Sequence, residues 1–127
     1  MSIRPRPLSP HLQVYRPQVT SVLSFLHRGT GLFLVLGTLM ISFWVITLAL
    51  GHNIFVIYQT WLGSLIGKVL LVFWSFSLFY HWANGIRHLL WDIGWGYDID
   101  RVYMTGWIVV SVSVILTGLL WLSVVFV

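Results

Sequence analysis

Two of the most apolar stretches of this sequence contain side chains that could do chemistry. The first is YHWANGIRHLLWD, residues 80–92, which places His81, Asn84, His88 and Asp92 three or four residues apart. At about 3.6 residues per turn, this spacing lines one face of a helix. Because polar groups buried in hydrocarbon cost several kcal/mol unless they find partners, we expect this face to point into a bundle of helices.

The second stretch is SFLHRGTG, residues 24–31, which on a helix also gathers its polar side chains on one face. If the start of this helix and the end of the other lie on the same side of the membrane, the two polar sets meet just inside that side. Little negative charge lies nearby, so such an excess of donors favours an anionic partner. The groups expected to converge, with Ser24 beside them, are His27, Arg28, Arg87 and His88.

The two histidines of residues 80–92 should lie at different depths. Measured from Asp92 along the helix axis, His81 lies about 16 Å and His88 about 6 Å into a hydrocarbon core about 30 Å thick. An imidazole at mid-depth can ligate a metal, relay protons or hydrogen-bond another helix, and for a single histidine the structural role is the commonest. A haem accounts for both sets, because its iron takes an imidazole and its propionates take Arg and His donors nearer the water.

One chain does not supply both axial ligands in this scheme. His81 and His88 are about 10.5 Å apart along the helix axis, so they cannot bind opposite faces of one iron. His27 and His11 are expected to lie too shallow, and His52 belongs to a loop on the far side. A six-coordinate haem would therefore need its second ligand from another chain, and the sequence predicts an oligomer.

Two further features each leave two interpretations open. Ser24 and Arg28 lie one turn apart at the membrane edge, where they could hydrogen-bond the carbonyl oxygens of a quinone. Alternatively, Ser24 bonds back to its own helix and Arg28 reaches the phosphate headgroups. Gly31 and Gly85 would leave room for a flat macrocycle, or would only let helices pack closely.

The composition places these segments in a membrane. Of the 127 residues, 58% are hydrophobic and 8% are charged, which lies outside the usual range of soluble domains. We predict an all-α integral membrane protein with transmembrane helices at about residues 21–50, 61–91 and 103–126, preceded by a surface segment of residues 1–20. GHNIF, residues 51–55, is expected to be a short loop. Without cysteine, the chain has no disulfide and no thiolate chemistry.

The basic residues predict how the chain crosses the membrane. Only Lys68 is expected near one side, so the N-terminus should be cytoplasmic, or on the matrix side in an organelle, with the C-terminus opposite. The net charge of +4 suits anionic lipid or an acidic partner, or is only this topology signal. The residues expected on the N-terminal side are Arg4, Arg6, Arg16, Arg28, Arg87 and Arg101.

Three stretches together resemble a known family, the cytochrome b subunits that anchor succinate dehydrogenase, respiratory complex II, in the membrane. They are RPLSPHLQVYRP at residues 6–17, SFLHRGTG at residues 24–31 and HWANGIRHLLWD at residues 81–92. The resemblance implies a heterodimeric, haem-binding helical bundle made with a second three-helix anchor subunit. It also implies a flavoprotein and an iron–sulfur subunit, through which electrons pass from succinate to ubiquinone and link the tricarboxylic acid cycle to the respiratory chain.

The resemblance also assigns residues. By motif match, His81 is the axial ligand of one haem b, with the second histidine expected from the partner anchor subunit. His27, Arg28 and His88 match positions around the haem propionates, while Ser24 and Arg28 match the quinone site. The chain would be a subunit of an enzyme without catalytic residues of its own.

The implied location is a bacterial inner membrane, with a mitochondrial inner membrane as the alternative. Other functions remain possible from the sequence: the anchor of a quinol:fumarate reductase, a small transporter subunit or an assembly subunit. A transporter usually has a carboxylate inside the membrane, and no Asp or Glu lies within any predicted span. An assembly subunit would leave the basic cluster without a ligand.

Overall fold

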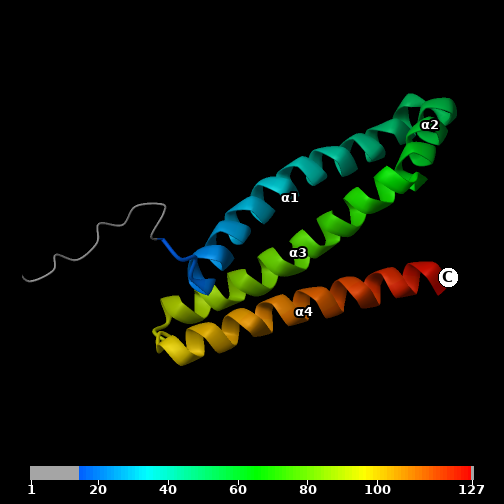
Figure 1. The fold of residues 1–127 in the computed structure, drawn as a ribbon. Helices are drawn as coiled ribbons and strands as arrows, with labels where there is room; N and C mark the ends of the chain where they lie inside the picture. The colour runs from blue at the N-terminus through cyan, green and yellow to red at the C-terminus, as the bar shows by residue number, and fades with distance from the viewer. Residues whose placement is uncertain (1–14, 127) are drawn as a thin grey trace, which may run out of the picture.

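The protein is a bundle of helices in the computed structural model, which describes residues 15–126 (Figure 1). Most of the predicted N-terminal segment, including Arg4, Arg6 and His11, lies outside the described residues. Three of the helices are long and apolar enough to cross a membrane, which confirms the predicted all-α membrane protein. Within residues 15–126 the helices are α1 (Val19–Leu50), α2 (His52–Gly63), α3 (Leu65–Asp92) and α4 (Ile99–Phe126).

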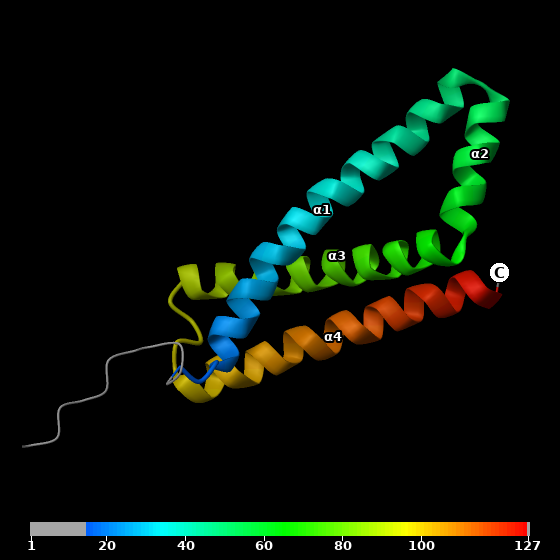
Figure 2. The same ribbon diagram turned by 45° about the horizontal axis from the view of Figure 1, so that its top comes forward.

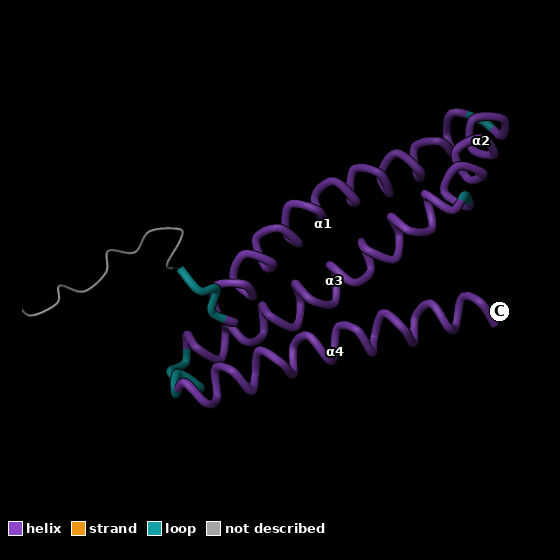
Figure 3. Tube along the Cα trace, viewed as in Figure 1, coloured by secondary structure: helices purple, strands orange, loops and turns teal. Residues whose placement is uncertain are grey.

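The three long helices share one end of the bundle. The start of α1, the end of α3 and the start of α4 lie together, while α2 and the C-terminal end of α4 lie at the opposite end (Figures 1 and 3). Helix α4 runs beside α3, whereas α1 leans across α3 and then diverges, so that α2 bridges their far ends (Figure 2). With 32 residues, α1 is about 48 Å long, which exceeds the hydrocarbon thickness and favours a tilted span.

Helix α2 replaces the predicted loop at residues 51–55 and the first turn of the predicted second span. Gly51, with φ of 111°, separates α1 from α2 in a conformation that favours glycine. The next break falls at Ser64, whose Oγ accepts a hydrogen bond from the Gly67 amide at 3.2 Å and so caps α3. A Cβ on Gly67 would collide with the carbonyl oxygen of Leu62, so this corner requires glycine. Gly63, four residues earlier, does not share this contact, since nothing lies within 4 Å of a Cβ built on it.

The helices pack through small and hydroxyl side chains, while large apolar side chains face outward. Among the exposed residues are Leu32, Leu65 and Phe126, as expected where lipid is the surrounding solvent. Five of the buried Ser and Thr hydroxyls donate to carbonyls of their own helix, as Ser113 Oγ does to the Val109 carbonyl at 2.7 Å. The buried polar residues are Thr30, Thr47, Ser75, Ser77, Asn84, Arg87, Ser113 and Thr117.

Two glycines and one tyrosine fix the contacts of α1. A Cβ on Gly37 would overlap the indole of Trp74, and a Cβ on Gly106 would press on Leu23. Tyr80, which is 1% exposed, donates its hydroxyl hydrogen bond to the Leu23 carbonyl at 2.9 Å. These contacts hold the first half of α1 in the angle between α3 and α4.

The link between α3 and α4 is shorter than predicted. Gly94, with φ of 85°, ends α3 in a Schellman motif, in which the Trp95 amide reaches the Leu90 carbonyl at 3.0 Å. Helix α4 then begins at Ile99 rather than near residue 103, with Asp100 in its first turn, where a carboxylate interacts favourably with the helix dipole.

Candidate functional site

Three imidazoles form one stack where α1 leans across α3. The ring of His27 on α1 lies between two rings of α3, at 4.0 Å from His81 with an interplanar angle of 10°, and at 5.0 Å from His88 with an angle of 19°. The two stretches that the sequence singled out therefore meet. One turn of α1 lies beside two turns of α3, and this brings together histidines that are far apart in the sequence.

The hydrogen bonds of His81 fix its tautomer. Its Nδ1 lies 3.1 Å from the main-chain oxygen of His27 and 3.4 Å from Thr30 Oγ1. A carbonyl oxygen only accepts, so Nδ1 carries the proton and Nε2 has a free lone pair. Within residues 15–126, Nε2 has no hydrogen-bond partner. An imidazole held in this way through Nδ1 is the usual form of a metal-ligating histidine.

Gly31 is part of the support of this ring. A Cβ on Gly31 would lie 3.0 Å from Cε1 of His81, which is tighter than ordinary contact. In this chain Gly31 therefore makes room for the imidazole of His81. Gly85 has open space beside it among the described residues, as clearance for a neighbouring group requires.

The other two histidines have different surroundings. His88 donates from Nδ1 to the Asn84 carbonyl at 2.8 Å, so its Nε2 also has a lone pair. Nδ1 of His27 is buried and has no partner in the described part of the chain. A buried polar atom without a partner is costly and marks a place where a further group is expected.

The sequence placed His27 at the depth of His88 only, and this was partly right. His27 lies beside His81 as well as beside His88, because the tilt of α1 carries it past both positions. The second ligand of an iron at His81 still cannot be His27, because two rings stacked face to face at 4.0 Å do not direct their nitrogens at one atom between them. Among residues 15–126, no cluster of three or more His, Cys, Asp or Glu is arranged to hold a metal ion.

Arg87 does not join the basic cluster, contrary to the sequence-based expectation. It is 4% exposed and turns toward α4, where Nε donates to Thr105 Oγ1 at 3.0 Å and NH2 donates to the Val102 carbonyl at 2.8 Å. Asn84 lies with it and is fully buried. The polar face of α3 is therefore divided between the histidines on one side and the Asn84 and Arg87 pair on the other.

Ser24 and Arg28 lie on α1 next to the stack. Ser24 is half-buried and Arg28 is exposed. Neither side chain makes a hydrogen bond to any of residues 15–126, so Ser24 does not bond back to its own helix. In the described part of the chain, the ion pair between Arg101 and Asp98, at 3.4 Å, is the only one, and it leaves the guanidinium of Arg28 without a carboxylate.

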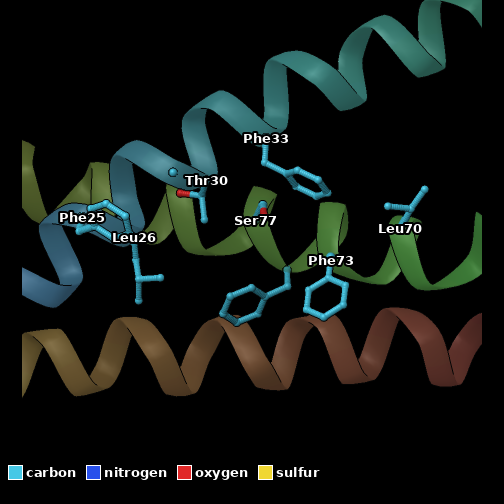
Figure 4. A pocket seen from close by; sticks show the side chains of 9 residues that line it. Phe25, Leu26, Thr30, Phe33, Leu70, Phe73 and Ser77 are labelled. Carbon is cyan, nitrogen blue, oxygen red and sulfur yellow. The ribbon is translucent and has the colours of Figure 1, made fainter. Parts of the chain in front are cut away.

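An apolar cavity of about 460 Å³ lies between α1 and α3, and Thr30 is one of its lining residues (Figure 4). Thr30 and Ser77 provide its hydroxyl groups, and the Thr30 hydroxyl also lies beside Nδ1 of His81. Sequence reasoning missed this role of Thr30, although its position three residues after His27 was a usable signal. The cavity is lined by Phe25, Leu26, Gly29, Thr30, Phe33, Leu70, Phe73, Phe76 and Ser77.

Comparison with known proteins identifies the family. Residues 2–120 match the model of the succinate dehydrogenase/fumarate reductase transmembrane subunits. The succinate dehydrogenase cytochrome b556 subunit of Rickettsia felis is 46% identical over 116 residues, covering 91% of this chain and 90% of that protein. The corresponding subunit of Paracoccus denitrificans is 35% identical over 114 residues, with 90% and 88% covered. The cytochrome b560 subunit of Reclinomonas americana is 35% identical over 126 residues, with 92% and 85% covered. The chain therefore belongs to the family of succinate dehydrogenase and fumarate reductase transmembrane subunits.

Proposed function

We propose that this chain is one of two membrane anchor subunits of a succinate:ubiquinone oxidoreductase, and that it holds a haem b through His81 and a quinone through Ser24 and Arg28. The observation that carries the haem assignment is the bond from His81 Nδ1 to the His27 carbonyl, which leaves Nε2 free to ligate. The names of the relatives, which are cytochrome b subunits of succinate dehydrogenase, support the same assignment.

The residues of the site fit a haem on three counts. His81 has the tautomer that an axial ligand needs. The buried Nδ1 of His27 and the guanidinium of Arg28 both lack a partner among the described residues, and propionate oxygens would accept from both. His88, with Nδ1 bound to Asn84, is the third group on this side. When bound, a six-coordinate haem b supplies a one-electron redox centre without an open position for oxygen.

A second chain would complete the haem site in this proposal. His27 stacks face to face on His81, and His88 stacks on His27, so neither ring is placed across an iron from His81, and the second axial ligand would come from a partner. We assign this role to a second three-helix anchor subunit, with an iron–sulfur subunit and a flavoprotein docked on the side where α1 begins. That side is the cytoplasmic face of a bacterial inner membrane in this proposal, or the matrix face of a mitochondrial one.

Ser24 and Arg28 would hold the quinone head group. Both are donors without partners in the described part of the chain, one turn apart on α1 and near its first residue, Val19. A hydroxyl and a guanidinium can each donate to a quinone oxygen, and the charge of Arg28 favours the electron-rich oxygen that develops during reduction. The isoprenoid tail stays in hydrocarbon. Protons would be taken from the aqueous side on which α1 begins.

The haem assignment is tested on the whole complex purified from membranes. The reduced-minus-oxidised spectrum should contain a b-type band, and His81→Ala should remove or strongly diminish it, because the iron loses an axial ligand. His52→Ala is the matched control, since His52 is exposed at the far end of the bundle. A full band in the His81→Ala complex would refute the ligand assignment.

The quinone assignment has a separate test. Ser24→Ala and Arg28→Ala should each lower quinone reduction about tenfold, the equivalent of one lost hydrogen bond in a catalytic site. Succinate oxidation with an artificial electron acceptor should persist, because that reaction bypasses the membrane subunits. Ser21→Ala, one turn earlier on α1 and exposed, serves as the control. Unchanged quinone reduction in both test variants would remove Ser24 and Arg28 from the pocket.

A further inference from the structure

We infer that Arg87 is a positioning residue, which ties α4 to the imidazole stack and thereby fixes where His88 lies. The inference rests on the proposed function, because His88 is there one of the groups around the haem propionates. It deepens that function by assigning a role to a buried cation that touches none of the proposed ligands.

The first half of the connection joins Arg87 to α4. Its guanidinium has two partners there, Thr105 Oγ1 at 3.0 Å and the Val102 carbonyl at 2.8 Å. The Thr105 hydroxyl is itself held, because it donates to the Arg101 carbonyl at 2.8 Å. The planar group is thus held at more than one point, which a lysine ammonium would not reproduce.

The second half joins Arg87 to His88 by two routes. Its guanidinium carbon lies 4.2 Å from the centre of the Trp91 ring. The Trp91 and His88 rings are T-shaped to each other, with their centroids 5.0 Å apart. On the other side, NH1 donates to Asn84 Oδ1 at 3.3 Å, and the main-chain oxygen of Asn84 accepts from His88 Nδ1 at 2.8 Å. His88 is therefore fixed between Asn84 and Trp91, and Arg87 contacts both.

The electrostatic setting argues against a role in stability alone. Arg87 is 4% exposed, and no carboxylate pairs with it among residues 15–126. A buried cation that is compensated only by neutral oxygens and a ring face contributes less to stability than an apolar side chain of similar size would. Its directional bonds do, however, define one geometry. Since His27 stacks on His88, this geometry extends across α1 to His81.

The inference is tested on the assembled complex with three variants. Arg87→Met keeps the length of the side chain and removes its donors. Thr105→Val removes one acceptor from α4, on a residue that touches no histidine, and Thr105→Ser keeps that acceptor as the conservative control. The first measurement is the rate at which diethyl pyrocarbonate modifies His88, followed by peptide mass spectrometry, with the exposed His52 as the internal standard. The second is the haem midpoint potential.

We expect Arg87→Met to increase modification of His88 several-fold relative to His52 and to shift the haem potential. Thr105→Val should act in the same direction with a smaller effect, and Thr105→Ser should match the unsubstituted complex. If Arg87→Met does not assemble, Thr105→Val decides. Unchanged His88 modification in every assembled variant would overturn the inference. A complex without a b-type band would refute the proposed function, while the modification of His88 would still test the position of its ring.

Discussion

Gly31 lies against the ring of His81 with no room for a side chain. Because a Cβ there would lie 3.0 Å from Cε1 of His81, Gly31→Ala should force the ring to move by a few tenths of an ångström. Overpacking of this kind costs about 1–3 kcal/mol. We expect a lower haem content and a lower midpoint of thermal unfolding. Gly29→Ala, two residues earlier with open space around it, should match the unsubstituted complex in both measurements. Equal effects of the two substitutions would show that Gly31 does not shape the site.

Residue types and spacing predicted that His27 and His88 meet, but not that His81 joins them or how the side chains are oriented. His27, His81 and His88 come together because the period of the helix sets their faces. Arg87 follows the same period and was assigned to the same cluster, yet its long side chain reaches Val102 and Thr105 on α4. The helical period of residues 80–92 does not show which other helix packs against Arg87. The hydrogen bond of His81 to the His27 carbonyl could not be predicted from the sequence either, since it depends on how closely α1 approaches α3.

One glycine lets α1 and α3 approach closely in the middle of the bundle. A Cβ on Gly37 would overlap the indole of Trp74, so Gly37→Ala should push the two helices apart and reduce the yield and thermal stability of the assembled complex. Gly118→Ala, in the middle of α4 with open space around it, should have little effect. Adding Trp74→Leu to Gly37→Ala should recover part of the loss, because the smaller side chain leaves room for the methyl group. Additive effects of the two substitutions would mean that they do not share this contact.

At the scale of elements, the long apolar helices were predictable and the short one was not. Runs of apolar residues predict spans directly. Gly51, His52 and Asn53 are typical of a loop, so the sequence predicted a loop at residues 51–55 and a span from residue 61, with no helix between them. The break at Ser64 depends on a single cap and on the close approach of Gly67 to Leu62. One helix cap and one glycine contact are too local to stand out in a hydropathy pattern that the membrane spans dominate.

The whole molecule is polar where its helices meet and apolar where it faces outward. Buried Asn84, Arg87 and the hydroxyl residues lie between the helices, while large aliphatic side chains are exposed. In hydrocarbon this distribution is stable, because the backbone groups along each span are hydrogen-bonded within its helix. The charged groups lie chiefly at the end where α1 starts and α3 meets α4, and Lys68 lies in the first turn of α3 at the other end. The chain is thus asymmetric across the membrane.

This asymmetry predicts the orientation of the chain, which can be measured because the sequence has no cysteine. Asn53→Cys at the start of α2 and Asp98→Cys before α4 place one exposed thiol at each end of the bundle. In intact cells, a maleimide that cannot cross the inner membrane should label Cys at position 53 and should label position 98 only after that membrane is permeabilised. Both positions are exposed in this chain, and labelling of position 98 after permeabilisation shows that the docked subunits do not cover it, so the difference reports the side of the membrane. Labelling of position 98 in intact cells, with position 53 protected, would invert the proposed topology and move the docking side of the soluble subunits with it.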